Sequence, residues 1–143
     1  MSQLEQLYQA TILAHDRAPH HAGRVDAPTH AARLDNPLCG DEIDLTVRID
    51  AGQICDIRFE GRGCALSRAA ASLMTCAVTA RSPADAVALA DAFERFVREP
   101  VDAPTPDGLG ELTAFAGVRR FRARAGCATL AFRALRAALA SEA

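Results

Sequence analysis

The chain has 143 residues, of which half are hydrophobic and 24% are charged, a composition typical of one globular domain. Its formal net charge of −2 gives no electrostatic footprint for nucleic acid, and no apolar run approaches the roughly 18 residues that a membrane span needs. The first residues lack the basic start of a signal peptide, so we expect a cytoplasmic protein. In that compartment its five cysteines would be reduced and free to act as ligands or nucleophiles.

The first half of the chain predicts one helix and then strands. Residues 3–15 place apolar side chains at helical spacing, and the prolines and glycine of "DRAPHHAGRVDAP" end this helix. A short edge strand is expected at about residues 27–34. Apolar and polar residues then alternate over 43–49 and again over 55–59, with "DAGQ" between them. This period of two predicts an antiparallel hairpin.

The second half of the chain predicts helices. An apolar stripe begins near Ser67, and Ser82 followed by Pro83 is an orderly start for a further helix. A loop rich in proline and glycine follows, and residues 112–126 predict a short helix and then an extended lead-in. The last helix is expected to start at Cys127. Strands followed by helices favour an α+β fold, and we expect one domain over residues 1–143.

Two of the five cysteines are predicted to be core residues. Cys55 has the strand parity of Ile57 and Phe59, and Cys76 lies on the apolar stripe of the helix that begins near Ser67. A free cysteine in such a position usually behaves as a small buried hydrophobe. We therefore expect both thiols to be buried and chemically inert.

The other three cysteines lie at the boundaries of predicted elements. Cys39 precedes the hairpin, whereas Cys64 and Cys127 begin helices, whose free N–H groups stabilise thiolates. Asp41 has the parity of Cys39, so both side chains leave an extended backbone on one side. Three thiolates and one carboxylate would complete a tetrahedral zinc site, and a thiolate-rich set also suits iron–sulfur chemistry. Spacing alone leaves open three unrelated buried thiols.

Three separated blocks, "NPLCGDEIDL", "DIRFEGRGCALSRAAASLMT" and "GCATLAFRAL", resemble the U-type iron–sulfur assembly proteins of the SufU/IscU family, also called NifU N-terminal-like. The segment "ILAHDRAPHHAG" is similar to the family's His-Tyr-x-x-Pro-x-x-x-Gly segment, so the resemblance covers nearly the whole chain. It implies a SufE/NifU-like fold, with a small antiparallel three-stranded sheet packed against about four to five helices. It also implies that Cys39, Asp41, Cys64 and Cys127 gather at one end as metal ligands.

The resemblance is stronger to the SufU type than to the IscU type. The segment "VREPVDAPTPDGLGELTAFAGV" is similar to an insertion typical of SufU, and Gly126 stands where IscU-type scaffolds usually have histidine. SufU members usually have lysine there, and Asp16 replaces the tyrosine expected after His15, so the details of partner docking depart from the family pattern. The SufU type implies Zn²⁺, a SufS-type cysteine desulfurase as sulfur donor and a downstream scaffold such as a SufBCD-type complex.

Cys39 is the predicted persulfide acceptor, because neighbouring Gly40 allows the local movement that its release from zinc on docking would require. The resemblance to SufU implies the same acceptor. Two alternatives remain: an IscU-like scaffold for a transient [2Fe–2S] cluster or iron, and a zinc ion that only stabilises the fold.

Four arginines and four histidines complete the candidate residues. The arginines lie just before Cys127 and form either a solvated face or a docking patch for an acidic surface of the desulfurase; they are Arg119, Arg120, Arg122 and Arg124. His15 matches the family's N-terminal histidine. The other three, His20, His21 and His30, are expected to be solvated, although His20 or His21 could offer a fifth ligand.

Overall fold

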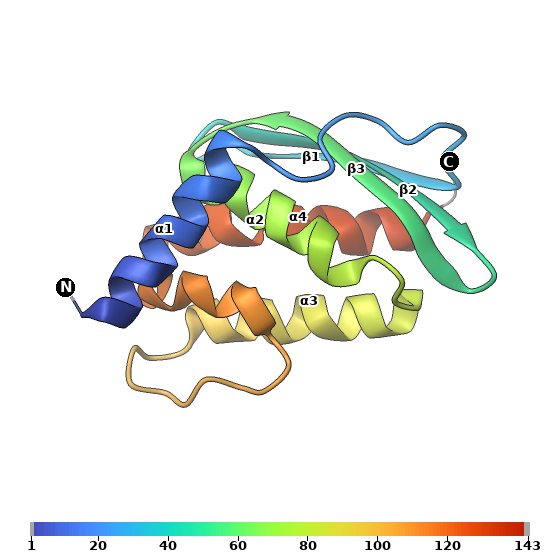
Figure 1. Ribbon diagram of the computed structural model, residues 1–143. Coiled ribbons are helices and arrows are strands. Elements are labelled where there is room, and N and C mark those ends of the chain that lie inside the picture. The colour runs from blue at the N-terminus through green and yellow to red at the C-terminus, as the bar shows by residue number, and fades with distance from the viewer. Residues whose placement is uncertain (1, 142–143) are drawn as a thin grey trace.

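The computed structural model describes residues 2–141, which form a three-stranded antiparallel sheet covered by helices (Figure 1). The strand order is β1-β2-β3, so each strand pairs with its neighbour in the sequence. The α+β fold that the resemblance implied is confirmed. In chain order the elements are α1 (Gln3–Arg17), β1 (His30–Asn36), β2 (Asp41–Asp50), β3 (Gln53–Arg62), α2 (Ala65–Val78), α3 (Pro83–Arg98), the 3₁₀ helices η1 (Gly110–Arg120) and η2 (Arg122–Arg124), and α4 (Ala125–Leu139).

The helices form layers beneath the sheet. α4 packs on β1 and β2, α2 packs on β3, and α3 lies on the far side of α4 together with η1 (Figure 1). Four phenylalanines fill the space between the helices, with the ring of Phe93 stacked on Phe132 at 4.4 Å and edge-on to Phe115 at 5.5 Å. No helix within residues 2–141 is long and apolar enough to cross a membrane.

The predicted hairpin is confirmed, with one irregularity that determines whether the Cys55 side chain is buried. Ala51 and Gly52, both with positive φ, join β2 to β3 in a two-residue turn. Arg48 pairs with Asp56, but the next residue, Ile49, pairs with Ile54, so Cys55 is the extra residue of a β-bulge. The bulge shifts the alternation by one residue. The prediction that Cys55 is buried is therefore wrong, and its side chain is exposed.

The predicted helices are present, with two corrections. Residues 122–124 form η2 where an extended lead-in was expected, so α4 begins at Ala125, before Cys127. Cys76 is exposed although it lies on the helix predicted to bury it, because the buried stripe of α2 runs through Ser72, Leu73 and Thr75. The N-terminal segment covers the face of α2 that carries Ser72 and Thr75, and it does so through polar contacts.

α1 differs from the other α-helices in having no buried residue among those described. Ser2 caps its first turn by accepting a hydrogen bond from Glu5 N at 3.0 Å. Its C-terminal half is fixed to α2 by an ion pair of 3.2 Å between Asp16 and Arg68. The chain after α1 follows the edge of β3, where Gly23 N donates to Phe59 O at 2.8 Å. Polar contacts thus hold the N-terminal segment in place.

Candidate metal and sulfur site

Cys39 lies in the tight turn between β1 and β2. Asn36, the last residue of β1, accepts hydrogen bonds at its carbonyl from Cys39 N at 3.2 Å and Gly40 N at 2.9 Å. Gly40 has a φ of +74°, a conformation that residues with a side chain adopt only at a cost. This turn presents the Cys39 side chain at the surface of the molecule.

Asp41, the first residue of β2, is fully buried and lies at the centre of the site. Its Oδ1 accepts a hydrogen bond from the backbone N–H of Cys64 at 2.8 Å. Its Oδ2 accepts from the Cys39 thiol at 2.8 Å and lies 3.8 Å from Cys64 Sγ. A single buried carboxylate therefore connects the hairpin turn to the start of α2.

The helix starts supply the other two sulfurs. Cys64 is the N-cap of α2, and Cys127 lies in the first turn of α4, where it is 1% exposed. Cys127 Sγ lies 3.1 Å from Cys39 Sγ, and the ligand atoms of Cys39, Asp41 and Cys127 all lie within 4.8 Å of one another. Cys64 stands beside this group through its contact with Asp41. The structure thus brings the four sequence-predicted residues to one place.

The chemistry of these donors suits a metal cation. Burial, followed by hydrogen bonds with Cys39 and Asp41 and the nearby negative charges, raises the pKa of the Cys127 thiol far above its ordinary value. A bound cation opposes the effects of burial and of the negative charges, because it replaces lost hydration and attracts thiolate. Three sulfurs and one carboxylate oxygen match the ligand types and number of a closed zinc site, which has metal–ligand bonds of about 2.0 to 2.3 Å.

Two structural residues of the site were missed by the sequence analysis. A Cβ added at Gly63 would overlap Asp41 Oδ1 and lie 2.7 Å from its Cγ, so the glycine allows the carboxylate to approach α2. Asn36, which is 7% exposed, holds the Cys39 turn with its carbonyl and with its side-chain oxygen. The signals were the "GRG" before Cys64 and an asparagine at a turn position.

Gly126 also has a structural consequence. A Cβ at this position would lie 2.9 Å from Asn36 Nδ2, so the absence of a side chain leaves room for the asparagine that holds the Cys39 turn. The carbonyl of Gly126 accepts a hydrogen bond from Arg133 at 3.0 Å. The departure from the family pattern therefore coincides with close packing between α4 and the end of β1.

The histidines lie away from the four predicted ligands. Ser72, on α2, is hydrogen-bonded to His15 Nδ1 at 2.7 Å and accepts from His20 N at 2.8 Å, while His21 Nδ1 meets Thr75 Oγ1 at 2.9 Å. Ser72 is eight residues after Cys64, about 12 Å along the helix. His20 and His21 thus contact α2 and fasten the N-terminal segment to it, away from the predicted ligands, so their positions do not favour the alternative of a fifth ligand.

Most of these histidines are also less solvated than predicted. His20 is exposed, but His21 and His30 are half-buried, and His30 Nδ1 lies 2.8 Å from Thr29 Oγ1. Burial lowers the pKa of His15 and of His21 below the ordinary value. The charge of nearby His20 acts in the same direction on both rings.

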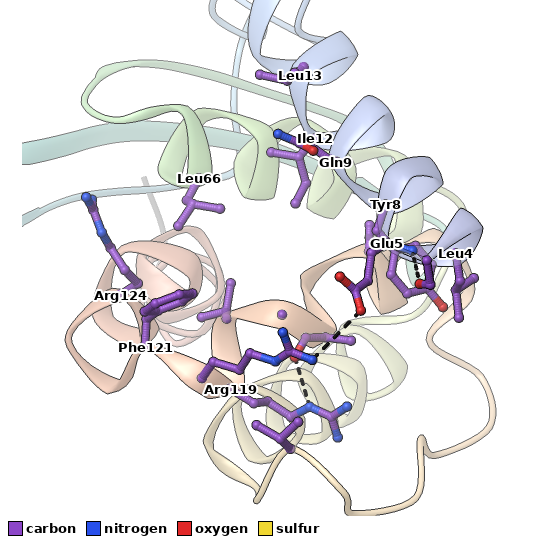
Figure 2. A pocket seen from close by; sticks show the side chains of 17 residues that line it. Leu4, Glu5, Tyr8, Gln9, Ile12, Leu13, Leu66, Arg119, Phe121 and Arg124 are labelled. Atoms are coloured by element: carbon purple, nitrogen blue, oxygen red, sulfur yellow. Dashed lines mark hydrogen bonds and ion pairs between the residues drawn. The ribbon is translucent and has the colours of Figure 1, made fainter.

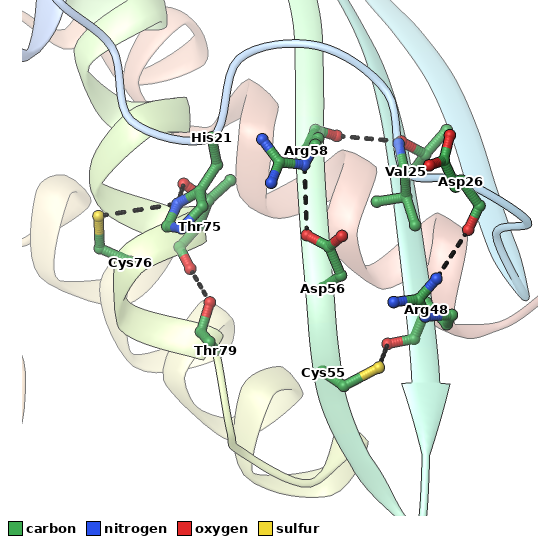
Figure 3. A network of polar contacts seen from close by, with 11 residues as sticks. His21, Val25, Asp26, Arg48, Cys55, Asp56, Arg58, Thr75, Cys76 and Thr79 are labelled. Carbon is green, nitrogen blue, oxygen red and sulfur yellow. Dashed lines mark hydrogen bonds and ion pairs between the residues drawn. The ribbon is translucent and has the colours of Figure 1, made fainter.

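Cys55 and Cys76 belong to a separate polar network (Figure 3). The Cys55 thiol donates to Arg48 O at 3.3 Å, and Cys76 Sγ lies 4.0 Å from His21 Nδ1. Burial raises the pKa of the Cys76 thiol, so this cysteine is not prepared to act as a thiolate. Neither sulfur joins the site at the other end of α2.

The four arginines differ in their contacts. Arg119 is half-buried, stacks on the ring of Phe96 at 4.9 Å and donates to the carbonyls of Ala116 at 3.0 Å and Ala103 at 3.1 Å, which is a structural role. Arg120 lies 3.8 Å from Glu5 of α1. The remaining two, Arg122 and Arg124, are exposed and form no ion pair within the described part of the chain.

An apolar groove of about 580 Å³ separates α1 from η1 (Figure 2). Leu4, Tyr8 and Ile12 of α1 line one side, and Phe121 lines the other. The groove reaches toward the cysteine site, because its lining includes Leu66, two residues after Cys64, together with Arg124, three residues before Cys127.

The fold and this site define a class: a small α+β domain that gathers three cysteines and an aspartate at one end of its sheet. The sequence profile of the NifU-like N terminal domain matches residues 7–128. The chain is 43% identical, over 97% of its length and 86% of the relative, to the iron–sulfur cluster assembly scaffold protein IscU of Streptococcus pyogenes serotype M1. It is 34% identical, over 97% of its length and 93% of the relative, to the zinc-dependent sulfurtransferase SufU of Bacillus subtilis strain 168.

A solved structure agrees with these relatives. The crystal structure of the N-terminal part of a nitrogen-fixing NifU-like protein from Brucella abortus superimposes with a TM-score of 0.85 at 26% identity, and the match covers 97% of this chain and 96% of that one. The chain belongs to the SufU/IscU family of NifU-like N-terminal domains.

Proposed function

We propose that this protein works in iron–sulfur cluster assembly as a zinc-dependent sulfur acceptor. Cys39 takes persulfide sulfur from a SufS-type cysteine desulfurase and passes it to a downstream scaffold such as a SufBCD-type complex. The relationship to a zinc-dependent sulfurtransferase of Bacillus subtilis supports this proposal. The need for reduced thiols favours the cytoplasm as its place of action.

One observation carries the proposal: Cys39 is exposed at the surface, and the residues that its sulfur contacts, Asp41 and Cys127, are buried. Cys39 is exposed, whereas Asp41 is 0% exposed and Cys127 is 1% exposed. A sulfur acceptor must meet the persulfide of another protein, and Cys39 is the sulfur of this site that is most open to such an approach. Cys127 and Asp41 are placed to hold the site together.

Cys39, Asp41, Cys64 and Cys127 are the residues that would hold zinc. The ion supplies positive charge, which keeps the thiols in their ionised form and protects them from oxidation. Asp41 orients the Cys39 sulfur through their 2.8 Å contact, and the Asn36 carbonyl fixes the backbone of the turn. Gly40 allows the backbone after Cys39 to adjust locally when the partner arrives, while Asn36 keeps the residues before it in position.

The transfer step exchanges one sulfur–sulfur bond for another. The Cys39 thiolate attacks the terminal sulfur of the desulfurase persulfide and forms a new S–S bond to it. The bond between that sulfur and the desulfurase cysteine breaks, and the desulfurase cysteine leaves as a thiolate, to be reprotonated from solvent. Cys39 then carries the persulfide, and no external oxidant or reductant is consumed.

Transfer of labelled sulfur tests the acceptor assignment. The protein is incubated with a SufS-type desulfurase and ³⁵S-cysteine, and the label bound to each chain is measured after separation without reductant. We expect Cys39→Ser to accept no label, while Cys55→Ser, which alters an exposed cysteine outside the site, accepts it at the native rate. Native labelling of Cys39→Ser would refute the assignment.

A second candidate function is that of an IscU-like scaffold on which a [2Fe–2S] cluster, or iron, is assembled. The 43% identity to the Streptococcus pyogenes scaffold protein favours it. Metal analysis of the purified protein and anaerobic reconstitution with iron and sulfide separate the two functions. Low zinc content together with a stable cluster absorbance would favour the scaffold. Zinc that is needed for folding, without sulfur transfer or cluster formation, would indicate a stabilising metal only.

Within the sulfur-transfer proposal, Arg122 and Arg124 are the best candidates for electrostatic docking, since both guanidinium groups are exposed. Arg120 can join them if its contact with Glu5 opens, while Arg119 is engaged by carbonyl groups. Charge complementarity at an interface rim mainly accelerates association. We expect the stimulation of the desulfurase to weaken with salt, and this salt dependence to decrease in a double Arg122→Ala, Arg124→Ala variant.

A further inference from the structure

The turn that carries Cys39 also carries the most exposed large apolar side chain among residues 2–141. Leu38 is 95% exposed, compared with 63% for Phe121 and 60% for Leu7. Single exposed leucines are common on protein surfaces and need no explanation by themselves. Leu38 differs because it is adjacent to the thiol that the proposed reaction uses.

The turn holds Leu38 out in a fixed position. Asn36 Oδ1 accepts a hydrogen bond from Leu38 N at 3.2 Å, and the Asn36 carbonyl accepts from the next two residues. Pro37 restricts the backbone before the leucine. Because Asn36 is itself 7% exposed, the anchor of the turn belongs to the body of the domain. The side chain of Leu38 is therefore presented on a firm support.

The proposed reaction brings the partner protein close to Leu38. The persulfide sulfur must come into bonding range of Cys39 Sγ, and the Cα atoms of adjacent residues are only about 3.8 Å apart. A folded protein that delivers sulfur to Cys39 therefore comes within reach of the neighbouring leucine, and contact with its side chain would exclude water from it. Contact of Leu38 with an apolar surface of the partner is favourable. Contact with a polar surface is costly, because Leu38 offers that surface no hydrogen bond.

We propose that Leu38 is the apolar anchor for the cysteine desulfurase and enters an apolar recess beside the persulfide-bearing cysteine of that enzyme. This inference rests on the proposed sulfur-transfer function. The fully buried core of a protein interface is usually apolar and depleted of charge, and Leu38 would lie in such a core. A fixed turn also reduces the conformational entropy that is lost on docking.

The expected effect follows from the burial of one leucine. Full burial of a leucine side chain corresponds to about a tenfold to a hundredfold change in affinity. Leu38→Ser should therefore raise the concentration of this protein that half-saturates the desulfurase by about tenfold or more. Leu38→Met keeps an apolar side chain of similar volume and should remain within about threefold of wild type. Folding should be unaffected, since Leu38 contributes almost no buried surface.

The test measures ³⁵S transfer from a SufS-type desulfurase at a series of concentrations of the full chain. The variants are Leu38→Ser, Leu38→Met and the control Leu7→Ser, which alters an exposed leucine on α1 that lies outside the groove. We expect higher half-saturation for Leu38→Ser alone, with the transfer rate at saturation, metal content and melting temperature kept. Equal half-saturation of Leu38→Ser and wild type, or equal weakening by Leu7→Ser, would overturn the inference. Failure of wild type to accept sulfur would overturn the proposed function and this inference with it.

Discussion

Replacing Gly63 by alanine tests whether the approach of Asp41 to α2 holds the site together. The new Cβ would overlap Asp41 Oδ1, so the carboxylate or the start of α2 must move. Either movement breaks the 2.8 Å hydrogen bond from Cys64 N to Asp41 and separates the two predicted ligands. Gly52→Ala is a matched control, because Gly52 also has positive φ but nothing lies within 4 Å of an added Cβ.

The magnitude follows from two contributions. A side chain in the positive-φ region costs about 1 to 2 kcal/mol, and this cost applies to both variants. Loss of a hydrogen bond to a charged group adds about 1.5 to 3 kcal/mol for Gly63→Ala alone. We therefore expect the free energy of unfolding to fall by about 2.5 to 5 kcal/mol in Gly63→Ala and by about 1 to 2 kcal/mol in Gly52→Ala.

Urea unfolding followed by circular dichroism gives both free energies, and metal analysis after dialysis gives the ligand-binding consequence. Gly63→Ala should lose metal that Gly52→Ala retains, because only the first change displaces Asp41. The reasoning is refuted if the two variants lose equal stability and hold equal amounts of metal. That outcome would mean that Asp41 and α2 accommodate a methyl group between them.

Three further predictions concern residues outside the ligand set. Arg119→Ala should lower the free energy of unfolding by about 1 to 3 kcal/mol, whereas Arg122→Ala should change it by less than about 0.5 kcal/mol, as measured by urea unfolding, because of the two only Arg119 donates to half-buried backbone carbonyls within the described residues. Burial depresses the pKa of His21. Below about pH 6.5 this side chain is therefore protonated in the unfolded chain before it is protonated in the folded protein. Stability should therefore fall as the pH drops from 7 toward the folded pKa, and His21→Gln should flatten this dependence; an unchanged slope would contradict it. A double Cys55→Ser, Cys76→Ser variant should keep native metal content and sulfur transfer, and loss of either would assign these exposed thiols a role.

The boundary positions of the four site residues favoured one shared site, although spacing alone left three unrelated buried thiols open. Cys64 is the N-cap of α2 and Cys127 lies in the first turn of α4, two helices that pack side by side under the sheet, and Asp41 begins the strand above them. The order of elements thus constrains their positions before any side chain is placed. The family blocks around them gave the same set, and the relatives confirm the family.

The two wrong predictions, that Cys55 and Cys76 are buried, have local physical causes. Cys55 was assigned to the core by strict alternation, which one extra residue in a bulge reverses. Cys76 was assigned to an apolar stripe, but the neighbouring face of α2 receives the histidine segment, so hydroxyl groups rather than methyl groups are buried there. Both outcomes depend on contacts between distant segments, which a periodic pattern within one segment does not contain.

The close approach of other side chains to Gly63 and Gly126 could not be predicted from the sequence, for a similar reason. A glycine before a cysteine signals freedom of the backbone, but the atom that occupies the vacant space belongs to another element. For Gly63 this atom is in Asp41, and for Gly126 it is in Asn36. Only the three-dimensional arrangement identifies these partners.

None of the described residues of α1 is buried, and this affects how firmly the helix is held. A helix held by ion pairs, hydroxyl groups and a few half-buried side chains can open at a lower free energy than the core around Phe93 and Phe132. Cys127 and Asp41 belong to elements packed in that core, so their spacing does not depend on α1. One wall of the groove is thus held by weaker contacts than those that hold the sulfur-bearing end of the molecule.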